Sequence, residues 1–132
     1  MRDDYNRVMT TAFNGASNIV QGGGLACLDD AGLSEIQTLI EYYLGNAKIL
    51  RECAESIGFD AYGGDDSPYV FVDLKGESSW DMFSKILEET CVVTIPGAGF
   101  GPGGEGFLRL SAFASRDSCI EASKRLEKMF KK

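Results

Sequence analysis

The chain has 132 residues, a hydrophobic fraction of 44% and a formal net charge of −7 at pH 7. This length fits one domain with a real hydrophobic core, and the composition argues against disorder. The acidic balance argues against a nucleic-acid partner, because phosphate binding needs a basic surface. No apolar run is long enough to cross a membrane and no signal peptide is visible, so we expect no membrane partner.

The sequence holds four cysteines and no histidine. The cysteines are Cys27, Cys53, Cys91 and Cys119, and no two of them have the Cys-x-x-Cys spacing. We therefore expect no metal site. Three of the four lie in apolar helical patterns, which predicts small buried side chains in a reducing compartment.

Residues 5–28 have the pattern of a helix with an unusual polar face. Asn14, Ser17, Asn18 and Gln21 recur at helical spacing and form an uncharged polar stripe. Such a stripe indicates a semi-buried polar environment. The alternative is a helix start capped by Asn14, with neutral surface beyond it.

The remaining elements follow from apolar periodicity. Apolar residues recur at three- and four-residue steps from Leu33 to Ile57, which predicts one long helix across a domain core, with a coiled coil as the alternative. Gly58 is expected to end this helix. The order that follows is β-β-α-β-β-α. Its strands are expected at 59–62, 69–74, 91–95 and 107–113. One of its helices begins at the cap Ser78, and the other is expected from about Ser115 to Phe130.

These elements predict the composition of the core. The strand 69–74 is almost continuously apolar, which predicts burial on both of its faces. The helix after Ser78 has one apolar face, formed by Trp80, Phe83, Ile86 and Leu87. We expect a single core that contains Val70, Val72, Trp80, Phe83, Leu108 and Leu110.

The glycine-rich stretch 97–106 contains a Gly-x-Gly-x-x-Gly spacing from Gly99 to Gly104. A dinucleotide-binding loop with this spacing is followed by a helix, whereas a strand is predicted here, and Pro102 removes one backbone amide. We therefore reject a dinucleotide site. The excess of glycine indicates a loop that passes close to a ligand or partner chain, and the alternative is a flexible connection between strands.

Arg109 is the strongest candidate for a binding residue. Alternation along the strand turns it away from the face of Leu108 and Leu110 and places it between Phe107 and Phe113. A guanidinium fork in this setting suits a carboxylate bound through two hydrogen bonds. The alternative is an arginine on a solvated strand face.

No catalytic pair of nucleophile and base can be assembled, because histidine is absent and the acidic residues are scattered. Lys75 could in principle react with a carbonyl group. It lies at a polar turn beside Gly76 and Glu77, which is typical of a surface lysine. We therefore assign no catalytic residue to this chain.

Two motifs carry a family resemblance that extends from about residue 5 to about residue 130. Phe13–Asn18 (Phe-Asn-Gly-Ala-Ser-Asn) and Gly97–Arg109 (with Gly-Phe-Gly-Pro-Gly-Gly-Glu-Gly-Phe-Leu-Arg) resemble the C-terminal third of the LL-diaminopimelate aminotransferases. The segments around Tyr62, Pro68 and Ser78 are similar to that family as well. It belongs to the class I/II aminotransferases, which use pyridoxal 5′-phosphate (PLP).

The resemblance implies roles for two residues and the absence of a third. Asn14 would reach the active site of the other subunit of a homodimer and contact cofactor and substrate there. Arg109 would bind the α-carboxylate of the substrate. The cofactor-binding lysine of the family precedes Met1, so the chain is expected to be a fragment that is inactive alone.

The fold class implied is α/β, an α+β small domain of a fold-type I PLP-dependent transferase. Residues 1–30 would end the large domain or link the two domains, and residues 31–132 would form the C-terminal small domain. The full-length enzyme would transfer an amino group between LL-diaminopimelate or tetrahydrodipicolinate and glutamate or 2-oxoglutarate in lysine biosynthesis. It would do so in a bacterial cytoplasm or a plastid stroma. The alternatives are another class I aminotransferase, for alanine or an aromatic amino acid, and a non-catalytic α+β binding domain.

Overall fold

The computed structural model describes residues 1–13 and 15–131. They form two compact units, Met1–Thr38 and Leu39–Lys132, and the boundary falls inside the long helix α3 (Asp30–Ser56). The domain division that we expect from the sequence, at residues 30 and 31, stays a prediction.

The first unit contains two short helices and the start of α3. Helix α1 (Arg2–Ala12) ends before Phe13, whose backbone is extended, and α2 (Asn18–Ala26) begins after the cap Ser17. The single helix expected over 5–28 is therefore wrong. Ser17 and Gln21 of the expected stripe instead lie at the start of α2, where the Ser17 side chain accepts a hydrogen bond from the Val20 amide and Gln21 donates to the Ala16 carbonyl. The side chains of α1 and α2 are exposed.

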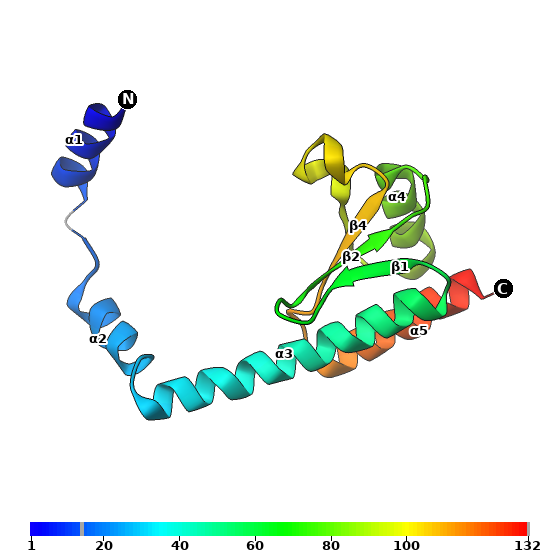
Figure 1. Ribbon diagram of the computed structural model, residues 1–132, viewed down its shortest axis with the longest axis horizontal. Helices are drawn as coiled ribbons and strands as arrows, with labels where there is room; N and C mark the ends of the chain where they lie inside the picture. Colours follow the sequence, from blue (N-terminus) through cyan, green and yellow to red (C-terminus); the bar gives the residue numbers. More distant parts are fainter. Residues whose placement is uncertain (14, 132) are drawn as a thin grey trace. The chain divides into compact units, whose positions relative to one another are not determined.

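The second unit is built on a four-stranded antiparallel sheet in the order β1-β2-β4-β3. The strands are β1 (Asp60–Gly63), β2 (Tyr69–Asp73), β3 (Ile95–Pro96) and β4 (Phe107–Ser111). Helix α4 (Ser79–Thr90) lies between β2 and β3 in the chain, and α5 (Arg116–Phe130) follows β4 (Figure 1). The expected order β-β-α-β-β-α and the α+β fold class are confirmed.

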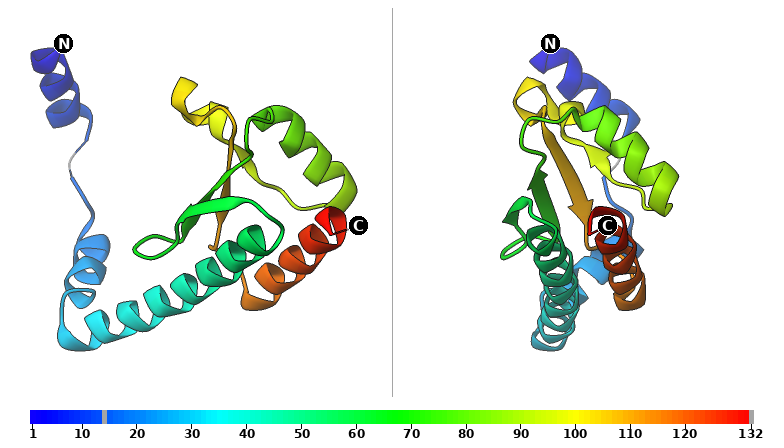
Figure 2. Two further views of the ribbon diagram at one scale, coloured as in Figure 1. Left: turned by 45° about the vertical axis from the view of Figure 1, so that its right-hand side comes forward. Right: turned by 90° about the vertical axis from the view of Figure 1, so that its right-hand side faces the viewer.

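The hydrophobic core lies between one face of this sheet and three helices and forms two clusters rather than the single one expected, because Leu108 belongs to a different cluster from Val70, Val72 and Leu110. Helices α3 and α5 lie side by side against the sheet, and α4 covers the adjoining part (Figure 2). The sheet contributes alternate residues, so that Val70 and Val72 of β2 face the helices together with Leu108 and Leu110 of β4. The helices contribute Ala47, Leu50, Cys53, Ala54, Met82, Ile86, Cys119, Leu126 and Met129.

Two expectations about the burial of side chains are wrong. Strand β2 is not buried on both faces, because helices cover only one side of the sheet, and Tyr69 and Phe71 of β2 are half-buried on the other. Trp80 is 57% exposed, because α4 turns Ser79, Met82 and Ile86 toward the core instead. The hydroxyl of Ser79 accepts a hydrogen bond from the Gly106 amide, and this contact fixes the rotation of the helix.

The strand expected over 91–95 is reduced to Ile95–Pro96. Cys91 instead ends α4 in a left-handed conformation, with φ 56°, and its amide donates to Leu87. Gly58, the expected stop of the long helix, has φ +94° just after α3. Among the described residues no helix is both long and apolar enough to cross a membrane.

The first prediction tests the phase of β4. Leu108 is 2% exposed at the centre of the sheet, so Leu108→Ala should lower the free energy of unfolding by about 2–5 kcal/mol. Trp80→Ala, at an exposed site, should cost under about 1.5 kcal/mol. Urea unfolding of the chain and the two variants measures both values, and a larger loss for Trp80→Ala than for Leu108→Ala would contradict this packing.

The second prediction concerns the cysteines, of which only two are buried rather than the expected three. Burial raises the pKa of the Cys53 and Cys119 thiols, whereas Cys27 and Cys91 are exposed. A raised pKa leaves less thiolate at neutral pH, and burial also blocks the reagent. Labelling of the native chain should therefore modify Cys27 and Cys91 quickly and the other pair only on unfolding, as peptide mass spectrometry can measure.

Candidate substrate-binding site

The face of the sheet opposite the helices carries Arg109 among aromatic side chains, together with the carboxylates of the cross-strand pair Asp60 and Asp73. Tyr62, Phe71, Arg109 and Ile95 are consecutive cross-strand partners and form a row across all four strands. Alternation along each strand places this row opposite the buried leucines and valines. Arg109 is therefore turned away from the core, as the sequence predicts.

Two aromatic rings hold the guanidinium of Arg109. Its Cζ atom lies 4.4 Å from the ring centroid of Tyr69 and 4.7 Å from that of Phe100. The expected flanking residues, Phe107 and Phe113, are not its ring contacts. Phe113 stacks edge-on against Tyr69 instead, with a centroid distance of 5.6 Å.

Sequence reasoning missed Tyr69 and Phe100 for different reasons. Tyr69 lies on β2 two residues from Phe71, the cross-strand partner of Arg109, so it is a diagonal neighbour. That position follows only from the register of β2 with β4. Phe100 comes from the glycine-rich loop. A large aromatic residue among small ones is the sequence signal that could have identified it.

Arg109 differs from every other arginine in residues 39–131. Arg51 pairs with Asp65 at 2.9 Å, Arg116 donates to the Tyr42 carbonyl at 3.1 Å, and Arg125 pairs with Glu121 at 2.8 Å. Within the described part of the chain, Arg109 makes no ion pair or side-chain hydrogen bond, and its Nε is buried without a partner.

Arg109 Nε is the one charged group among four buried side-chain atoms that lack a hydrogen-bond partner in the described residues; the others are Asn46 Oδ1, Thr94 Oγ1 and Ser123 Oγ. A buried donor without a partner costs about 1–3 kcal/mol, so such a group in a folded protein calls for an explanation. A bound anion supplies one, because a carboxylate can accept two parallel hydrogen bonds from the planar fork. The aromatic surroundings compete for none of these donors, since a ring attracts the cation through its π face.

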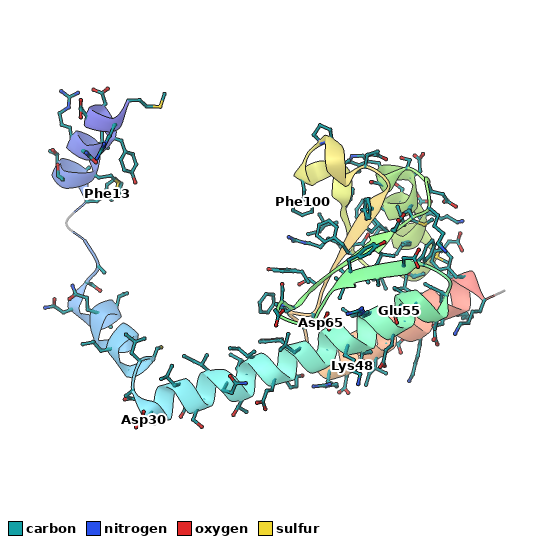
Figure 3. The ribbon with its side chains drawn as sticks, in the orientation of Figure 1. Phe13, Asp30, Lys48, Glu55, Asp65 and Phe100 are labelled. Carbon is teal, nitrogen blue, oxygen red and sulfur yellow. The ribbon has the colours of Figure 1, made fainter. Side chains whose placement is uncertain are left out.

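The loop that carries Phe100 is folded into two short 3₁₀ turns, η1 (Gly97–Phe100) and η2 (Pro102–Gly104), rather than extended (Figure 3). The base of the loop is closed by two glycines in contact. A Cβ on Gly97 would lie 2.2 Å from the Gly104 carbonyl oxygen, and a Cβ on Gly104 would lie 2.0 Å from that of Gly97. Glycine is required at both positions because two backbones meet there.

The other sequence-predicted site residue, Asn14, lies outside the described residues, so its position relative to Arg109 is not described. The described lysines are all exposed: Lys48, Lys75, Lys85, Lys124, Lys128 and Lys131. Lys75 lies 4.0 Å from Asp60. A lysine that binds PLP needs a protected pocket, and within the described residues none of these six is buried. No group of three metal-ligating side chains occurs in the described residues either.

Comparison with known proteins gives consistent results. Residues 3–124 match the family model for aminotransferase class I and II. The chain is 51% identical over 128 residues to a probable chloroplastic LL-diaminopimelate aminotransferase of Oryza sativa subsp. japonica, covering 97% of this chain and 28% of the relative. It is 46% identical over 125 residues to the LL-diaminopimelate aminotransferase of Phocaeicola vulgatus, covering 94% of this chain and 31% of that protein.

A solved structure agrees with these sequences. L,L-Diaminopimelate aminotransferase from Chlamydomonas reinhardtii is 54% identical and superposes with a TM-score of 0.91, covering 97% of this chain and 32% of that one. The chain thus spans about a third or less of the length of each of these relatives. Because the family model covers most of the chain, and these relatives are about half identical to it over almost its whole length, the chain belongs to the class I and II aminotransferases.

Proposed function

We propose that this chain is the C-terminal part of an LL-diaminopimelate aminotransferase. The full-length enzyme would exchange an amino group between LL-diaminopimelate or tetrahydrodipicolinate and glutamate or 2-oxoglutarate. Identities of 46–54% to proteins of that name support this choice over an alanine or aromatic aminotransferase. The same identities speak against a binding domain unrelated to catalysis.

The observation that carries the proposal is the unpartnered guanidinium of Arg109. Its buried Nε and its two ring contacts leave a cation with donors to spare on the open face of the sheet. We assign to Arg109 the binding of the substrate α-carboxylate. This contact would orient the amino acid, so that the bond to be broken is held in a fixed position relative to the cofactor.

The cofactor we propose for the full-length enzyme is PLP, which supplies an electron sink when it is bound. No described lysine of this chain fits the cofactor-binding role, so we derive no step of the reaction from this chain beyond substrate orientation. Asn14 is proposed to contact cofactor and substrate in the partner subunit of a homodimer. Relatives of the chain include chloroplastic and bacterial enzymes, and we propose a plastid stroma or a bacterial cytoplasm accordingly.

The third prediction tests Arg109 in a full-length enzyme that carries this sequence. Arg109→Lys keeps the charge but loses the planar fork, so kcat/KM for LL-diaminopimelate should fall roughly 30- to 1000-fold, which corresponds to about 2–4 kcal/mol. Arg116→Lys is a matched control, because Arg116 also contacts a ring but donates to a backbone carbonyl. It should change kcat/KM less than about threefold. Near-normal kcat/KM for Arg109→Lys would refute the carboxylate role.

The fourth prediction concerns the chain by itself. Because its described lysines are exposed, the purified chain should take up no stoichiometric PLP and show no transamination. Absorbance after gel filtration with excess PLP measures the uptake, and release of glutamate from 2-oxoglutarate and LL-diaminopimelate measures the activity. A one-to-one complex linked through a single lysine would contradict the prediction.

A further inference from the structure

Phe100 contacts both members of the central cross-strand pair on the open face. Its ring lies 4.7 Å from the Arg109 Cζ atom, and 5.7 Å from the ring of Phe71 in an edge-on arrangement. Phe71 is the direct cross-strand partner of Arg109. Phe100 is 52% exposed within the described part of the chain, so no core of this part buries its ring.

The loop that places Phe100 is held at its base by specific contacts. Gly97 and Gly104 meet backbone to backbone, and the Glu105 carboxylate accepts a hydrogen bond from the Ser79 amide at 2.9 Å. The Ser79 hydroxyl accepts from the Gly106 amide at 3.0 Å. The loop is thereby attached to the first turn of α4, and Phe100 lies at the end of its first 3₁₀ turn.

Ring contacts suit an arginine that must bind a carboxylate. The guanidinium N–H groups lie in the plane of the group, and an aromatic π face attracts the cation without accepting a full hydrogen bond from each of them. A carboxylate neighbour would also restrain Arg109, but it would neutralise the charge and occupy the fork. The substrate would then have to displace that neighbour.

We propose that Phe100 is a positioning residue: together with Tyr69 it fixes the Arg109 guanidinium by ring contacts, so that the fork is oriented yet unoccupied before the substrate carboxylate arrives. The inference rests on the proposed function. In this proposal the glycine-rich loop holds the Phe100 ring against the Arg109 guanidinium. Tyr69 provides the contact from the rigid sheet and Phe100 provides the contact from the loop.

The test uses a full-length enzyme with this C-terminal sequence and separates binding from turnover. Phe100→Leu removes the ring but keeps apolar bulk, and it should raise KM for LL-diaminopimelate roughly 3- to 30-fold while kcat changes less than about threefold. The inhibition constant of succinate, a dicarboxylate without an amino group, should rise by a similar factor. Phe100→Tyr, which retains the ring, should restore both constants to within about threefold of the parent enzyme.

Three further variants keep the test decisive. Trp80→Leu is the matched control, because Trp80 is 57% exposed and stacks edge-on with Phe83 at 5.8 Å but touches no cation. It should leave KM and the succinate constant within about twofold. Gly104→Ala forces the loop base apart and should reproduce the Phe100→Leu effect, whereas Gly103→Ala, whose added methyl meets open space, should change both constants far less.

A double-mutant cycle separates the positioning role of Phe100 from the proposed carboxylate-binding role of Arg109. In an Arg109→Lys background, Phe100→Leu should raise the succinate constant less than about twofold further, because both residues act on the same contact. If Arg109→Lys impairs the enzyme but Phe100→Leu leaves both constants unchanged, the positioning role is wrong and the proposed function stands. Fully additive effects in the cycle would also overturn the positioning role. Normal binding in Arg109→Lys itself would overturn the proposed role of Arg109 and this inference with it.

Discussion

The antiparallel pairing of β2 with β4 is the constraint on which the rest of the second unit depends. It aligns Val70 with Leu110 and Val72 with Leu108, and these four side chains form the surface on which the helices pack. The same register sets Phe71 beside Arg109 on the opposite face. Because side chains alternate along a strand, a slip of one residue would bury the arginine and expose the leucines. The core and the open face are thus fixed by one set of hydrogen bonds.

A second, smaller set of polar contacts joins α4 to the glycine-rich loop. Ser79 is fully buried at the first turn of the helix, where it exchanges hydrogen bonds with residues 104–106. These hydrogen bonds satisfy polar groups that burial would otherwise leave unpaired, and the neighbouring Trp80 is left exposed. The contacts that set the rotation of α4 therefore also anchor the glycine-rich loop, so the loop geometry depends on that helix.

The electrostatic character of the open face follows from what surrounds Arg109. The chain is acidic, with a net charge of −7, and the other arginines of the second unit use backbone or carboxylate oxygens as acceptors. Arg109 instead has Tyr69 and Phe100 as neighbours, which stabilise a cation without neutralising it. An anion that approaches this face meets a positive charge whose hydrogen-bond donors are not already engaged. A planar guanidinium fork can donate two parallel hydrogen bonds to a carboxylate.

The sequence by itself determined the order of elements from β1 to α5, the cap Ser78, and the direction in which Arg109 points, because capping chemistry and strand alternation act over a few neighbouring residues. It also gave the resemblance on which the function rests. Only the tertiary structure decided that β2 has one open face, that Trp80 lies outside the core, and that the first helix breaks at Phe13. It also decided that Tyr69 and Phe100, rather than Phe107 and Phe113, hold the guanidinium. Each of these depends on strand register, on which surfaces the helices cover, or on a contact between residues far apart in the chain, and local periodicity carries no information about such contacts.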